Sequence, residues 1–426
     1  MNKTYKILEY GSFVRDKNVP GCVSLPKSTF DSLENFILSN RSKSVDALEL
    51  LRLGARKGVG KVIGAKNYVG VITMDDGTTI EILPKVYSSE QFSEAQVKKL
   101  LVSMIQTLKN TPFKCLQRAN LDTEKMDIFE IFITMFIEEV FYIVKCGLKS
   151  SYERVASNEN AFKGKLLFKD HIKANLAHKE RCFVEHDQFN VNCAENKILK
   201  ATLLYLYKYS KSSKNRNDIR TLLNSFANIS PSTDYEGDFS KIVSDRNNAN
   251  YHKALMWSKI FLKGKSFTAF AGSNVAFALL FPMEKLFERY IEVQLRKVLD
   301  KSRYTLLAQD SIYHLFSEPK KSFLMKPDLV IRDKVENNVY VLDTKWKILS
   351  SKKSNYDINQ GDMYQMYAYQ KKYNAKNITL IYPNSDPLIT SKNIEYNSGD
   401  GVTIKVKFVD LFNINKSLKE LLDDVL

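Results

Sequence analysis

Three charged residues in the C-terminal third of the chain have the types and spacing that phosphodiester chemistry requires. Asp328 follows a proline, and Asp343 and Lys345 form an Asp-x-Lys triplet further along the chain. Two neighbouring carboxylates repel each other unless a cation lies between them, and Mg²⁺ takes one or two carboxylates and fills its other positions with water and phosphate oxygens. A lysine beside that cation can orient or deprotonate the attacking water and offset transition-state charge. The three residues therefore predict a magnesium site for phosphodiester hydrolysis.

A β-hairpin is the element that would bring these residues together. Two β-type runs flank the polar residues 334–337, which suits a four-residue hairpin loop. If the residues on either side of this loop pair, the antiparallel register places Asp328 opposite Asp343, with Cβ atoms roughly 4.5–5.5 Å apart. Lys345 lies two residues beyond Asp343 and therefore on the same face. The sequence predicts two carboxylates and an ammonium on one face of one hairpin.

The Asp-x-Lys triplet alone is a weak signal, because such triplets arise by chance in most chains of this length. Residues 195–197, Glu-Asn-Lys, give an example in a helical pattern, where positions i and i+2 diverge. The alternative interpretation of the hairpin is a surface element with three scattered charges. The helical segment that follows favours a site, because it places Gln365 and Tyr369 one turn apart.

The order Pro-Asp, Asp-x-Lys and helix resembles the PD-(D/E)xK nuclease core, and the order helix–strand–turn–strand–helix covers residues 283–373. Residues 284–291 resemble the first helix of that core, which often adds a carboxylate, and Glu288 is the better match. The resemblance implies that the Thr344 carbonyl and Glu288 contribute to the metal site. It also implies that Gln365 and Tyr369 steady the site or the DNA backbone.

Composition is typical of a soluble globular protein with a polyanionic partner. The 426 residues suggest two or three domains, with 44% hydrophobic and 26% charged residues. A net charge of +16 and a pI near 9.3 favour binding to nucleic acid. The abundance of Lys, Asn, Ile, Tyr and Phe gives a second explanation, because an AT-rich genome produces the same bias. The positive net charge alone is therefore only modest support for nucleic-acid binding.

The cysteines and the apolar segments predict a cytoplasmic protein. Five cysteines are widely spaced without a C-x-x-C pair, so neither a disulfide framework nor a zinc site is predicted. The N-terminus lacks the apolar core of a signal peptide. The most apolar stretch, residues 128–144, contains three glutamates and therefore predicts a buried helix rather than a membrane span.

The N-terminal region predicts a β-rich domain with one basic loop. Residues 68–74 and 79–83 form the clearest hairpin pattern in the chain, whereas residues 47–53 have a helical pattern. Residues 54–61 are rich in glycine and basic residues, but Val62 stands where a phosphate-binding loop requires Ser or Thr. We interpret this segment as a flexible basic loop.

The middle of the chain predicts helices from about residue 92 to 209, followed by a basic, Ser/Asn-rich loop at residues 208–220. The expected organisation is a mixed α/β protein with a partner-binding domain at 1–92, a helical region at 93–265 and a nuclease domain at 266–426. Four basic residues are our candidate DNA contacts: Lys326, Lys347, Lys214 and Arg216.

Four segments in this order resemble the McrC family, the endonuclease subunits of McrBC-type restriction systems. They are Ile80–Val86, Asn160 to Lys165, Asn196–Lys200 and the nuclease core. The resemblance implies an McrB-like AAA+ GTPase ring as partner, which binds GTP and recognises modified DNA, with double-stranded DNA as substrate and Mg²⁺ as cofactor. Our candidate contacts to the ring are Arg56, Lys57 and Lys61.

Two other functions are compatible with these residues. One is a stand-alone PD-(D/E)xK nuclease of repair or recombination, which would cleave without a motor. The other is a non-catalytic regulator of an AAA+ ring, against which the intact set of Asp328, Asp343 and Lys345 argues. A GTPase that copurifies with the chain would separate the first alternative from a restriction subunit.

Overall fold

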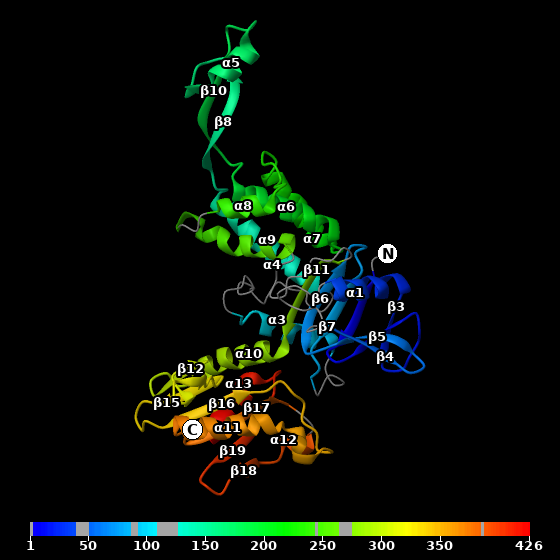
Figure 1. Cartoon of the computed structure of the whole chain (residues 1–426), viewed down its shortest axis with the longest axis vertical. Coiled ribbons are helices and arrows are strands. Elements are labelled where there is room, and N and C mark those ends of the chain that lie inside the picture. The colour runs from blue at the N-terminus through cyan, green and yellow to red at the C-terminus, as the bar shows by residue number, and fades with distance from the viewer. Residues whose placement is uncertain are drawn as a thin grey trace. The chain divides into compact units, whose positions relative to one another are not determined.

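The computed structural model describes residues 3–39, 51–86, 93–108, 127–242, 246–263, 275–384 and 387–426 (Figure 1). The chain divides into two compact units, one of residues 1–128 with 270–426 and one of residues 129–269. Both units combine helices with sheets, which confirms the predicted mixed α/β class. The division at residues 92 and 265 remains a proposal about independently folding domains. No helix among the described residues has the length and apolarity needed to cross a membrane.

Two four-stranded sheets form the N-terminal part of the first unit, in the orders β3-β2-β5-β4 and β1-β7-β6-β11. Their inner faces share one core, which includes Phe13, Leu33, Ile72 and Leu280. The predicted hairpin of β6 and β7 is confirmed, and its strands pair antiparallel from Thr73↔Thr79 to Gly70↔Ile82. The elements are β1 (Thr4–Leu8), β2 (Ser12–Arg15), β3 (Cys22–Leu25), α1 (Lys27–Ser39), β4 (Leu51–Arg56), β5 (Gly60–Ala65), β6 (Tyr68–Met74), β7 (Thr79–Leu83), α3 (Glu94–Ile105) and β11 (Val275–Pro282).

Two predictions in this part were wrong. Residues 51–53 belong to strand β4 rather than to a helix, and residues 47–50 lie outside the described residues. Residues 54–61 are not a flexible loop, because β4 and β5 pair antiparallel from Leu51↔Ala65 to Arg56↔Gly60. Gly58 and Gly60, with φ of 79° and 97°, allow the tight turn between β4 and β5. The pairing of the two strands outweighs local helix propensity here.

A six-stranded mixed sheet in the order β12-β15-β16-β17-β19-β18 forms the C-terminal part of the first unit. Helix α11 packs on one face over a core that includes Val341, Met366 and Leu380. Helices α10 and α13 pack against each other and contact strands β16 and β19 respectively. The elements are α10 (Met283–Val298), β12 (Tyr304–Ala308), β13 (His314–Phe316), β14 (Ser322–Leu324), β15 (Leu329–Asp333), β16 (Val339–Thr344), η4 (Ser354–Asp357), α11 (Gln360–Tyr373), β17 (Asn377–Pro383), α12 (Pro387–Thr390), β18 (Ile394–Asn397), β19 (Thr403–Val409) and α13 (Ile414–Val425).

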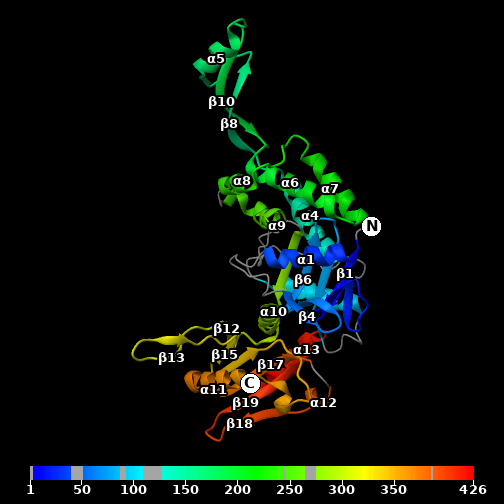
Figure 2. The ribbon, with the colours of Figure 1, turned by 45° about the vertical axis from the view of Figure 1, so that its right-hand side comes forward.

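The second unit combines a helical bundle with a three-stranded sheet that extends from it (Figure 2). Buried Glu130 on α4 accepts hydrogen bonds from Ser210 Oγ at 2.8 Å and Asn215 Nδ2 at 2.7 Å, which explains an acidic residue in this apolar helix. The elements are α4 (Ile128–Cys146), β8 (Ser151–Glu159), β9 (Lys165–Leu166), α5 (Phe168–Asn175), β10 (Cys182–Asn190), α6 (Ala194–Tyr209), α7 (Ser213–Ser225), α8 (Tyr235–Lys241), η3 (Arg246–Tyr251) and α9 (His252–Lys263).

Two predictions in the second unit also need correction. The region predicted to be helical contains the sheet β8-β10-β9, in which β8 and β10 pair antiparallel over nine residues each. Most of the predicted basic loop at 208–220 is helical, because α7 begins at Ser213 and the Ser212 side chain accepts from Asn215 N at 3.3 Å as its cap. The buried side chains of Ile219 and Leu222 then give this polar helix an apolar face.

Candidate active site

The hairpin of β15 and β16 has the predicted register. Its strands pair from Arg332↔Val339 to Leu329↔Leu342, so Asp328 precedes β15 at the level of Asp343. The loop is held by Asp333, whose carboxylate accepts from the backbone N–H groups of the following loop and from Arg303 at 3.0 Å. A loop fixed in this way prevents register slippage, which would move the carboxylates to the other face.

Asp328 is fixed by its neighbour on the second strand. Its Oδ2 accepts hydrogen bonds from the Thr344 backbone N at 2.8 Å and from Thr344 Oγ1 at 2.7 Å. Its Oδ1 lies 3.5 Å from Gln309 Nε2, which is longer than a good hydrogen bond. One oxygen of Asp328 is therefore committed to holding the side chain, and the other is the better placed for a ligand.

Asp343 and Lys345 form the centre of the cluster. Asp343 is 2% exposed, and its Oδ2 lies 2.8 Å from Lys345 Nζ. Lys345 Nζ is also 3.4 Å from Asp362 and 3.3 Å from Gln365 Oε1, both on α11. Gln365 Nε2 in turn donates to the Tyr369 hydroxyl at 2.7 Å, so the predicted one-turn spacing brings these two side chains into contact. Helix α11 thus holds the lysine against the carboxylate.

Glu288 reaches the same cluster from α10 through Gln309. Gln309 Nε2 donates to the carboxylate of Glu288, and Gln309 N donates to the Asp328 carbonyl at 2.9 Å. Sequence reasoning missed both Gln309 and Asp362. Asp362 could have been found, because it lies one turn before Gln365 on the same helix. Gln309 carried no signal, because its place beside Asp328 depends on the pairing of β12 with β15.

The electrostatics of the cluster favour a cation. Burial and, after it, the charge of Asp328 raise the pKa of Asp343 to about 7, against the opposing effect of Lys345. Burial, followed by the charge of Asp328, raises the pKa of Glu288 to about 7. Burial also raises the pKa of Asp328 against the hydrogen bonds from Thr344. Burial acts to lower the pKa of Lys345, but the charge and hydrogen bond of Asp343, together with the charges of Asp362 and Asp328, raise it overall. A divalent cation would relieve the repulsion among the three carboxylates.

The donor set fits Mg²⁺ rather than a metal held entirely by protein side chains. Among the described residues, no three acidic, histidine or cysteine side chains are already arranged as a complete metal cage. Mg²⁺ is commonly held by one or two carboxylates together with water and substrate phosphate oxygens. Asp328 and Asp343 match that requirement, and Glu288 lies close enough to Asp328 to influence the charge of the site.

The other predicted residues do not belong to this cluster. Lys326 and Lys347 flank the motif and are exposed, with Lys347 paired to Asp357 at 3.0 Å. Lys214 and Arg216 are exposed on α7 in the second unit. The candidate ring contacts Arg56, Lys57 and Lys61 lie on the β4–β5 hairpin. Lys61 Nζ forms an ion pair with Glu34 at 2.6 Å.

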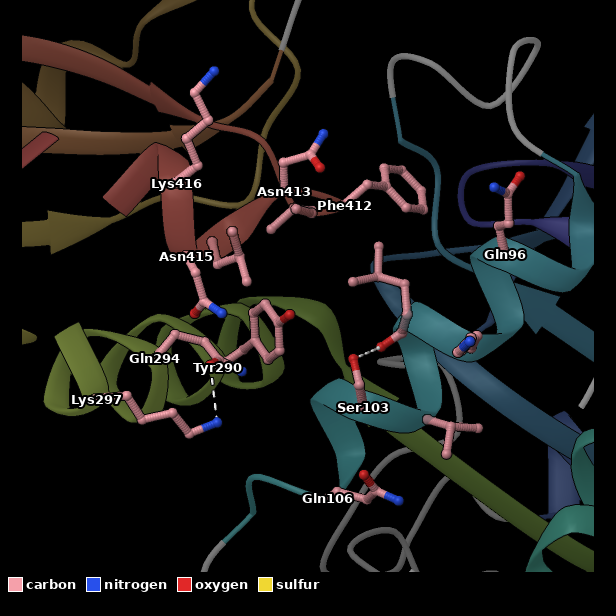
Figure 3. Close-up of a pocket in the computed structure, with 15 residues that line it drawn as sticks. Gln96, Ser103, Gln106, Tyr290, Gln294, Lys297, Phe412, Asn413, Asn415 and Lys416 are labelled. Carbon is pink, nitrogen blue, oxygen red and sulfur yellow. Dashed lines mark hydrogen bonds between the residues drawn. The ribbon is translucent and has the colours of Figure 1, made fainter. Parts of the chain in front are cut away.

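A cavity of about 810 Å³ lies between α3, α10 and the start of α13 (Figure 3). Its lining combines amides with three lysines, Lys99, Lys297 and Lys416. Tyr290 and Gln294 face it from α10, but none of the predicted site residues lines it. The cavity is therefore a feature separate from the carboxylate cluster.

Comparison with known proteins gives a family and a fold. A family model described as "McrBC 5-methylcytosine restriction system component" matches residues 63–383. A chain from the half-complex of the tetradecameric assembly of Thermococcus gammatolerans McrB AAA+ hexamers with bound McrC matches with a TM-score of 0.69 and 20% identity, covering 100% of both chains. A chain of the T. gammatolerans McrBC complex matches with a TM-score of 0.50 and 20% identity, covering 70% of this chain and 89% of the other. No curated protein matches.

Proposed function

Because the chain belongs to the family of McrBC 5-methylcytosine restriction system components, we propose that it is the nuclease subunit of such a system. In this proposal it cleaves double-stranded DNA with Mg²⁺ when coupled to an AAA+ GTPase ring, and it stimulates the GTPase of that ring. The observation that carries the proposal is the cluster of Asp328, Asp343 and Lys345 on one face of the β15–β16 hairpin.

Each side chain of the cluster has a role in this reaction. Asp328 and Asp343 would hold the Mg²⁺, with the Thr344 carbonyl and Glu288 as further contributors. When bound, Mg²⁺ polarises the phosphate and lowers the pKa of a bound water. The ammonium of Lys345 would orient the attacking water and stabilise charge on the phosphate oxygens. Gln365 restricts Lys345 to this position through its 3.3 Å contact, and Tyr369 holds the Gln365 amide.

The proposed partner is an McrB-like GTPase ring, because the T. gammatolerans structures with the same fold contain McrB with McrC. The basic β4–β5 hairpin with Arg56, Lys57 and Lys61 is one candidate surface for the ring. Another consists of β8, β10, α5 and the loops beside them in the second unit, where large apolar side chains are exposed and a protein partner would cover them. These side chains are Tyr152, Phe162, Phe168, Ile172, Leu176 and Phe189.

DNA binding is proposed to rest on phosphate contacts, with GTP binding and recognition of the modified base assigned to the partner. Lys326 and Lys347 flank the carboxylate cluster and are exposed, so they are suited to the DNA backbone next to the cleavage point. Lys214 and Arg216 would add contacts from the second unit. Such contacts position DNA but do not distinguish sequences.

The decisive test is cleavage of methylated duplex DNA by the chain with its cognate GTPase, GTP and Mg²⁺. Asp343→Ala and Lys345→Ala should each abolish cleavage and leave GTPase stimulation intact. Two control variants change exposed residues on α13: Asp423→Ala matches the lost negative charge and Lys419→Ala the lost positive charge. Both should cleave like wild type. Cleavage retained in Asp343→Ala would refute the site.

The same experiment separates the two alternative functions. A stand-alone nuclease would cleave at full rate without the GTPase and GTP. A non-catalytic regulator would stimulate the GTPase while wild type and Asp343→Ala gave the same background of DNA cleavage. A restriction subunit requires both partner-dependent cleavage and its loss in the variant.

A further inference from the structure

A buried carboxylate from the N-terminal end of the chain contacts the residue that follows Lys345. Glu9 directly follows strand β1 and is 2% exposed. The indole N–H of Trp346 points to both oxygens of this carboxylate, at 2.9 Å and 3.1 Å. Trp346 itself is 8% exposed. A contact between residues so far apart in the chain joins the N-terminal sheets to the strand that carries the candidate site.

Glu9 is firmly anchored on the N-terminal side. Its backbone N donates to the Leu83 carbonyl at 2.9 Å, and its Oε1 accepts from the backbone N of Lys85 at 2.8 Å. Burial raises its pKa to about 7, against the hydrogen bonds from Lys85 and Trp346. A carboxylate in this place is costly compared with an apolar contact. Its hydrogen bonds give the contact a direction, which an apolar contact would not have.

Trp346 lies between the two elements that supply the site. On one side it is the chain neighbour of Lys345, whose backbone N donates to the Ile381 carbonyl at 2.9 Å and so extends the pairing of β16 with β17. On the other side its ring packs against Phe287 of α10 with a centroid distance of 5.3 Å. Phe287 immediately precedes Glu288. A rotation of the indole would therefore disturb both Lys345 and Glu288.

We propose that Glu9 is a positioning residue for DNA cleavage, which acts through Trp346 to hold Lys345 and Glu288 in their working arrangement. This inference rests on the proposed nuclease function. It assigns the N-terminal part of the chain a direct effect on the rate of the chemical step, in addition to any contact with a partner. A misplacement of about 1 Å in such a site can cost roughly a hundredfold in rate.

Variants of Glu9 and Trp346 test the inference in the full chain with its GTPase partner. Glu9→Ala removes the acceptor and should lower kcat between about tenfold and a hundredfold, with the KM for DNA nearly unchanged. Glu9→Gln keeps an amide oxygen that can accept from Trp346 and should recover most of the rate. Trp346→Phe keeps the packing on Phe287 but lacks the indole N–H. In the double variant with Glu9→Ala, the reduction in kcat should be smaller than the two single reductions combined, because both changes break the same contact and their effects should not be additive. The matched N-terminal control is Asp31→Ala on α1, which breaks the ion pair between Asp31 and Arg15. This variant should cleave at the wild-type rate.

A purely structural role for Glu9 predicts a different outcome. In that case Glu9→Ala would melt earlier but show wild-type kcat at temperatures where it is folded, which would overturn the inference. Fully additive losses in the double variant would also overturn it. If Glu9→Ala fails to fold, Trp346→Phe decides alone: a lowered kcat supports the inference, and a wild-type kcat overturns it. Failure of the proposed function is distinct, because wild type and Asp343→Ala would then be equally inactive, and the positioning role would fall with it.

Discussion

Replacing Asp343 by asparagine should abolish cleavage and at the same time stabilise the metal-free protein. Asp343 is nearly fully buried beside Asp328, so its negative charge is poorly solvated and repelled. A rise in pKa from 3.8 to about 7 corresponds to an upper limit of about 4 kcal/mol between the two protonation states. Asparagine resembles the neutral acid in shape and charge. We expect a gain of about 1–4 kcal/mol in the free energy of unfolding at pH 8 without metal.

The sign of the pH dependence follows from the raised pKa. The folded state binds the proton of Asp343 more tightly than the unfolded state, so this residue contributes stability that is fully present below pH 3.8. That contribution is lost as the pH rises through about 7. The advantage of Asp343→Asn over wild type should therefore be small at pH 4 and largest at pH 8, in buffers that contain a chelator.

Denaturant unfolding of both proteins with and without Mg²⁺ measures this effect. Mg²⁺ should stabilise wild type through binding and should stabilise Asp343→Asn much less. Asp333→Asn is the control on the same hairpin and should have the opposite sign, because the Arg303 ion pair and loop N–H groups lower the pKa of Asp333 against the effect of burial. If Asp343→Asn were less stable than wild type at pH 8 without metal and responded equally to Mg²⁺, the electrostatic account of the site would be refuted.

Three further predictions concern the rest of the machinery. Thr344→Val removes one of the two hydrogen bonds to Asp328 and should lower cleavage about tenfold, measured at saturating Mg²⁺, while Thr344→Ser should restore it. DNA binding by the isolated chain should weaken linearly in log–log plots of affinity against salt and show no preference for methylated duplexes; a clear preference would mean that this chain reads the modification. Alanine at Arg56, Lys57 and Lys61 together should reduce GTPase stimulation. If Leu176→Ser removes the stimulation and the triple alanine variant does not, the ring contacts the α5 region of the second unit instead.

The register of the β15–β16 hairpin could be predicted because short-range rules decide it. Four loop residues and two β-type runs leave one pairing that buries the apolar residues of both strands, and the loop chemistry of Asp333 enforces it. The contact between Gln365 and Tyr369 was predictable for a similar reason, since helical spacing fixes it. Both inferences needed only neighbours within one element or one hairpin.

The wrong predictions came from segments in which local composition is ambiguous. Residues 51–53, Leu-Arg-Leu, are too few to show a distinct period, and their pairing with β5 makes them a strand. The polar residues 213–218 suggested a loop, although the cap at Ser212 and the buried Ile219 make the segment a helix. The alternating but polar strands β8 and β10 lacked the apolar signal that marks a half-buried strand.

Contacts within the first unit join the N-terminal part of the chain to the helix that carries Glu288. Strand β11 pairs with β6 from Pro282↔Tyr68 to Val275↔Met74, and α10 begins directly after it, where Met283 N donates to the Asn67 carbonyl at 2.9 Å. The start of the helix that carries Glu288 is therefore set by an N-terminal sheet. Deleting the N-terminal region would leave β11 without β6 and would disturb α10 as well as any partner contact. Loss of cleavage after such a deletion would thus not identify a partner site, whereas single side-chain changes keep the two effects apart.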